Sequence, residues 1–108
     1  MLVVDPARWT DEARATAKAL FGAPTRVLLS AWVLARGGEA FFQQEAQVAL
    51  LVLGEAATAV RRELATFVAE GLLDRFPDGH RLFFVQKEHP MWSAYEAIAV
   101  ALSLTRTA

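Results

Sequence analysis

The sequence predicts a mainly α-helical domain with one small β-hairpin. Three observations lead to this fold class. Apolar residues recur at helical spacing in several segments, and glycine or proline marks most boundaries between them. Near the end of the chain, two short strand-like runs flank a turn that contains Pro, Asp and Gly. No repeat or linker interrupts the 108 residues, so we expect a single domain covering residues 1–108.

The first two predicted helices begin at residues suited to helix starts and end at glycine. Thr10 can cap the first helix, and Asp11 lies in its first turn, where a carboxylate favours the positive helix end. Gly22 ends this helix. Pro24 suits the first position of a second helix, which carries apolar residues all round and runs to a Gly-Gly pair. Such a pattern indicates a helix that is covered on most sides.

A second pair of helices follows a short extended piece at Phe41 and Phe42. Residues 43–51 and residues 56–70 are predicted to be helical, with a turn at Gly54 between them. At 100° per residue, one side of the later helix is apolar, formed by Val60, Leu64, Phe67 and Val68. The opposite side carries small and basic residues, namely Thr58, Arg62, Ala65 and Ala69.

The chain then predicts a hairpin and a last helix. Residues 73–76 and 81–85 read as strands joined by a four-residue turn at 77–80. Pro90 opens the final helix, in which apolar residues recur at spacings of four, three and four, at Met91, Tyr95, Ile98 and Leu102. Turn, helix, glycine stop and hairpin follow the order of a winged helix-turn-helix, in which the exposed helix enters the DNA major groove.

Three segments resemble the ArsR-type (arsenic-repressor-like) winged helix-turn-helix regulators, with MarR-type regulators as close relatives. They are residues 20–29, which include the Pro-x-Arg motif; residues 53–64, the turn and basic helix; and residues 71–73 with the aromatic pair at 83–84. The resemblance implies a sequence-specific transcriptional regulator. We expect a homodimeric repressor that binds a palindromic operator through helix 56–70 and wing 74–85.

The expected DNA contacts combine basic side chains with small residues that allow close approach of the helix. Arginine can bind guanine or phosphate oxygens, and an alanine methyl can contact thymine. The expected DNA-binding residues are Ala57, Thr58, Arg61, Arg62, Arg75, His80 and Arg81. Glu55 fits this surface poorly because it would repel phosphate; it could instead accept a bond from cytosine or stabilise the helix end.

The net charge of the chain favours a partner other than DNA. The chain has a formal net charge of −1, so the molecule as a whole does not attract nucleic acid. Binding to DNA then requires local clusters of positive charge. The alternative is a winged helix that binds another protein and makes no contact with DNA.

Self-association is expected because 55% of the residues are hydrophobic, which is a large share for so small a domain. The terminal helices carry the surplus apolar faces, and two-fold pairing would double the DNA site. The expected dimer contacts are Trp9, Ala13, Ala17, Leu20, Met91, Trp92, Tyr95, Ile98 and Leu102. The aromatic members could alternatively be core residues or line a small-molecule pocket.

Several other classes of function lack support in the sequence. There is no cysteine for disulfides, thiolate metal sites or thiol nucleophiles, and the two histidines lack metal-ligand spacing. No catalytic motif is present, so neither enzymatic activity nor a cofactor nor a metal is expected. No membrane span or secretory signal is recognisable, which is typical of a cytoplasmic protein. The sequence identifies no effector molecule.

Overall fold

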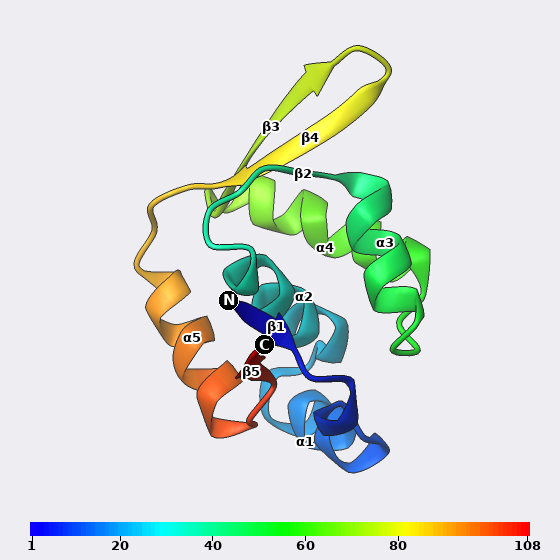
Figure 1. Cartoon of the computed structure of the whole chain (residues 1–108), viewed down its shortest axis with the longest axis vertical. Coiled ribbons are helices and arrows are strands. Elements are labelled where there is room, and N and C mark those ends of the chain that lie inside the picture. The colour runs from blue at the N-terminus through cyan, green and yellow to red at the C-terminus, as the bar shows by residue number, and fades with distance from the viewer.

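The computed structural model describes all residues, 1–108, as a mixed α/β domain with five α-helices. A β-hairpin that resembles a wing lies between the last two helices and projects from the helical body (Figure 1). In chain order the elements are β1 (Leu2–Val4), the 3₁₀ helix η1 (Pro6–Arg8), α1 (Asp11–Phe21), α2 (Pro24–Ala35), β2 (Phe41–Phe42), α3 (Gln43–Leu51), α4 (Ala57–Ala69), β3 (Leu73–Asp78), β4 (Arg81–Gln86), α5 (Met91–Ala101) and β5 (Thr105–Thr107).

The five predicted helices are confirmed, and most of their boundaries agree with the signals in the sequence. Thr10 Oγ1 accepts a hydrogen bond of 3.1 Å from the backbone N–H of Ala13, as a helix cap does. Helix α4 starts after Ala56, which offers no side-chain cap. In the preceding turn Gly54 takes a φ of 92°, a left-handed conformation that other residues rarely adopt.

The hairpin belongs to a three-stranded antiparallel sheet with the strand order β2-β4-β3. The predicted four-residue turn is wrong, because Pro77 and Asp78 lie within β3 and Asp78 pairs with Arg81. Gly79, with a φ of 64°, allows a two-residue turn at this point. Pro77 is tolerated because β3 is an edge strand.

A second small sheet joins the two ends of the chain and was not predicted. Strands β1 and β5 pair antiparallel, with Val3 opposite Arg106. Both termini therefore lie side by side near α2 (Figure 1). Each strand is only three residues long and lacks clear alternation, so the pairing depends on how the rest of the chain folds.

Helix α2 lies at the centre of the core, as its all-round apolar pattern predicted. Its residues Val27, Leu28 and Leu29 are almost fully buried. The apolar side of α4 is likewise buried at Val60, Leu64 and Phe67. None of the helices has the length and hydropathy that crossing a membrane would require.

Three residues that were expected to contact a second copy are instead buried in the core of the monomer, so this part of the prediction is wrong. Trp9, Ala17 and Trp92 are buried in the same apolar cluster as α2, so their side chains are not available to a second copy. Four more are partly buried and pack against this cluster, namely Ala13, Tyr95, Ile98 and Leu102. Only Leu20 and Met91 of the expected set are well exposed.

Candidate nucleic-acid interface

The solvent face of α4 carries the small and basic residues that the sequence placed there. Thr58, Arg61 and Arg62 are exposed, as are Ala65 and Ala69. Ala57 is half-buried, and its backbone carbonyl accepts a hydrogen bond of 3.1 Å from Gln47 Nε2 of α3. This bond helps to fix the start of α4 against α3.

The only carboxylate within α4 lies on its inner side. Glu63 is buried, and its Oε2 accepts a hydrogen bond of 2.7 Å from Arg26 Nε of α2. Arg62 Nε lies 3.7 Å from Glu63 Oε1, yet the Arg62 side chain remains 72% exposed. Within Ala57–Ala69, the solvent face of α4 therefore presents guanidinium groups without an exposed carboxylate among them; the exposed Glu70 follows at the end of the helix.

Glu55, in the turn before α4, is also removed from the surface. Its side chain is 1% exposed and accepts hydrogen bonds from three side chains, those of Trp9, Arg14 and Thr25. Burial raises the pKa of Glu55, but these hydrogen bonds and the charge of Arg14 outweigh burial and lower it. One of the two expected roles of Glu55 was a contact with cytosine. This expectation is wrong, because the carboxylate is buried and hydrogen-bonded inside the protein.

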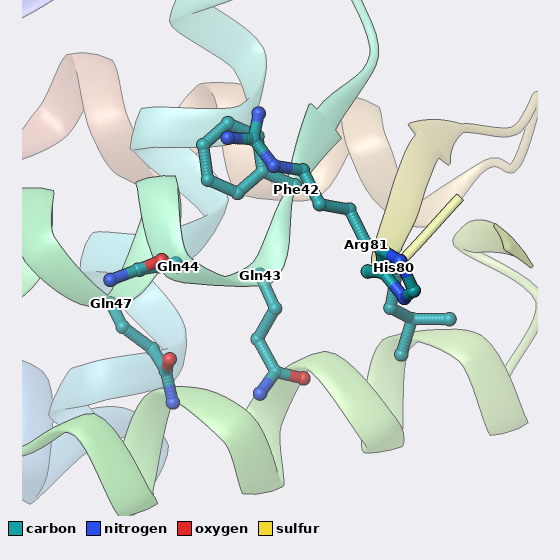
Figure 2. Close-up of a pocket in the computed structure, with 7 residues that line it drawn as sticks. Phe42, Gln43, Gln44, Gln47, His80 and Arg81 are labelled. Carbon is teal, nitrogen blue, oxygen red and sulfur yellow. The ribbon is translucent and has the colours of Figure 1, made fainter. Parts of the chain in front are cut away.

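A hollow of about 390 Å³ separates the hairpin from the start of α3; we call it the wing hollow. It contains no carboxylate, and its walls are formed by Phe42, Gln43, Gln44, Gln47, His80, Arg81 and Leu82. Figure 2 shows the Arg81 side chain reaching back over the ring of Phe42. The Arg81 guanidinium carbon lies 4.3 Å from the centre of that ring, a distance at which a cation and an aromatic face attract each other.

The three glutamines of the wing hollow were missed by the sequence reasoning. Gln43 and Gln47 extend from α3 towards α4 in Figure 2. Amide groups offer both a donor and an acceptor, which suits contacts to adenine or to phosphate. Their spacing at i, i+1 and i+4 of one helix could have indicated a cluster of amides. The sequence did not show that the hairpin lies beside this cluster, which is a feature of the tertiary structure.

The predicted hairpin cations do not form one group. Successive residues of a strand point to opposite faces, so Arg81 shares a face with Phe83, whereas Arg75 shares the other face with its cross-strand neighbour Phe84. Phe42 and Phe76 pack on either side of Phe83. His80 lies at the turn beside Arg81 and lines the wing hollow, but Arg75 does not.

No protein-family model, curated protein or solved structure matches this chain. No group of three or more His, Asp or Glu side chains comes together in a way that could hold a metal ion. The interface is therefore interpreted from its own geometry and charge.

Proposed function

We propose that this chain is a winged helix-turn-helix protein that binds double-stranded DNA in a sequence-specific manner. Helices α3 and α4 with their connecting turn form the helix-turn-helix. Helix α4 enters the major groove, and the β3–β4 hairpin acts as the wing that contacts the neighbouring backbone. The biological role is that of a transcriptional regulator, a homodimeric repressor that occludes a promoter.

One observation carries the proposal: the solvent face of α4 has exposed arginines and small residues and no exposed carboxylate. Arg61 and Arg62 can donate paired hydrogen bonds to base edges or phosphates. Thr58 and the alanines leave room for the helix backbone to approach the groove. An interface with Glu55 or Glu63 on its surface would repel phosphate, but both carboxylates are buried and paired.

The sheet supports the proposal because it fixes the hairpin relative to the helices. Strand β4 pairs with β2, and β2 continues directly into α3 at Gln43. Aromatic pairs reinforce this connection, with Phe41 stacked on Phe84 at a centroid distance of 5.7 Å. The hairpin and α3 are thereby held together, and the hydrogen bond from Gln47 to Ala57 joins α4 to the same unit.

The position of the charges bears on the objection raised by the net charge of −1. Affinity for phosphate depends on cations near the DNA, since screening limits the effect of charges more than about 10 Å away. The exposed arginines of α4 therefore count for more than the total charge, whereas at the hairpin the exposed Asp74 and Asp78 offset Arg75 and Arg81.

Dimerisation belongs to the same proposal. Two copies related by a two-fold axis would read half-sites about 34 Å apart, so the operator would be an imperfect palindrome. The terminal helices retain exposed apolar side chains for such pairing, among them Leu20, Met91 and Val100.

The decisive experiment is selection of duplexes from a random pool by the full-length protein, followed by affinity measurements over a range of salt concentrations. We expect enrichment of an inverted repeat and a linear fall of log affinity with log salt, with a slope set by the number of phosphates contacted. Failure to enrich any sequence, with no salt-dependent duplex binding, would overturn the proposal and favour the protein-interaction alternative.

A further inference from the structure

A second hollow, of about 410 Å³, lies against α4 at Ala59, Arg62 and Glu63; we call it the corner hollow. It is formed where the end of α1 and the start of α2 meet α4. Its charged lining consists of four cations, Arg14, Lys18, Arg26 and Arg62, and a single carboxylate, Glu63. Glu55, which is bonded to Arg14, is a second acid beside these cations, so the site keeps an excess of two positive charges in a chain whose net charge is −1.

Two of the four cations are held in place by buried acids. Arg26 Nε donates to Glu63 Oε2 at 2.7 Å, and Arg14 donates to Glu55 through Nε at 2.9 Å and through a terminal nitrogen at 3.3 Å. The terminal nitrogens of Arg26 make no hydrogen bond within the protein. Each acid therefore orients a guanidinium group and leaves donors free for an anion.

The other two cations are free of strong partners. Lys18 follows Arg14 by four residues, so both lie on one side of α1, and it forms no ion pair. Arg62 makes only the 3.7 Å contact with Glu63 and is mostly exposed. The single acid in the lining, Glu63, is nearly inaccessible and already neutralised by Arg26.

We propose that the corner hollow binds a phosphate of the DNA backbone and so makes helix α1 part of the DNA interface. This inference rests on the function proposed above. With α4 in a major groove about 12 Å wide, phosphate strands run along both sides of the helix. In the proposed complex, the hairpin contacts one of these strands and the corner hollow contacts the other. Such contacts fix position and strengthen binding without selecting sequence.

The first test is the salt dependence of duplex binding by Lys18→Gln, with Arg106→Gln as a control that removes the same charge from strand β5, which does not line the corner hollow. We expect Lys18→Gln to weaken binding to specific and random duplexes alike and to reduce the log–log salt slope by about one unit. Arg106→Gln should keep the parent slope. If Lys18→Gln keeps the salt slope of the parent protein while Arg81→Ala reduces it, the inference is overturned and the proposed function stands. If the parent binds no duplex at all, both are wrong.

The second test uses the lack of cysteine in this chain, which allows a single reactive site to be introduced. Lys18→Cys carrying a tethered iron chelate should cut the duplex backbone beside the selected half-site. The same reagent on Arg106→Cys should not give cuts at that position. Two results would contradict a backbone contact at the corner hollow, even with intact binding. In one, the chelate at residue 18 does not cut the duplex; in the other, it cuts at the same positions as the chelate at residue 106.

Discussion

The indole nitrogen of Trp9 donates a hydrogen bond of 3.1 Å to Glu55 Oε2, although 46 positions separate the two residues in the chain. This bond joins the segment before α1 to the turn before α4. Arg14 and Thr25 add further hydrogen bonds to the same carboxylate. One buried acid therefore anchors the start of the proposed groove helix to three preceding segments, namely the residues before α1, α1 itself and α2.

Replacing this acid should destabilise the fold. Glu55→Gln retains the shape of the side chain but loses the charge that orients Arg14, so we expect the free energy of unfolding to fall by about 2–4 kcal/mol. Urea denaturation of parent and variant at pH 7 measures this. Glu96→Gln, at an exposed position of α5 without an ion pair, is the control and should change stability by less than about 0.5 kcal/mol. Equal stability of Glu55→Gln and parent would show that the network contributes little.

The same carboxylate should make stability depend on pH. The folded protein lowers the pKa of Glu55 below its ordinary value of 4.5, so its contribution is complete above that value. The contribution is lost as the pH falls through the folded-state pKa. The difference in unfolding free energy between parent and Glu55→Gln should therefore narrow between pH 5 and pH 3. A constant difference over this range would contradict the assignment.

Arg62→Ala should weaken binding to the best selected duplex by about 1–3 kcal/mol, because a guanidinium at the α4 face is removed. Since Arg62 is 72% exposed, thermal unfolding should be nearly unchanged. Fluorescence anisotropy at one salt concentration measures the affinity, and Arg106→Ala serves as the charge-matched control. Parent affinity in Arg62→Ala would show that this face does not enter a groove.

Arg81→Ala should reduce the salt slope of binding by about one unit, because the hairpin of the proposed complex contacts backbone phosphate more than bases. Arg75→Ala is the matched comparison, since this residue lies on the other face of the same hairpin. We expect Arg75→Ala to leave the slope closer to that of the parent. Equal effects of the two variants would mean that long-range charge, rather than contact at the wing hollow, controls binding.

Sedimentation should show a dimer of the 11.9 kDa chain at micromolar concentration. Ile98 is a poor site to test this because it packs against the core, and an acid there would unfold the protein. Val100 is 70% exposed on α5, so Val100→Asp should give a folded monomer with much weaker operator binding. Val52→Asp, at a position that is 80% exposed in the turn after α3, should remain dimeric. A parent that sediments as a monomer would exclude the dimer.

Much of the fold followed from local signals in the sequence. Caps such as Thr10, breakers such as Gly22 and Pro24, and the apolar periodicity of α4 act within one or two turns of chain, so they can be recognised without tertiary information. The same periodicity identified the solvent face of α4, including Thr58 and Arg62, because a helix with one buried side must expose the other.

The remaining features depended on contacts between residues far apart in the chain. Nothing local distinguishes Glu55 from an exposed acid; its role arises because Trp9, Arg14 and Thr25 converge on it after folding. The pairing of β1 with β5, the stacking of Arg81 on Phe42, and the burial of Trp9 and Trp92 were decided in the same way. The sequence by itself determined which segments are helices and which side of α4 is free. Only the tertiary structure decided which charges remain at the surface, because burial depends on the whole packing arrangement and not on any local pattern.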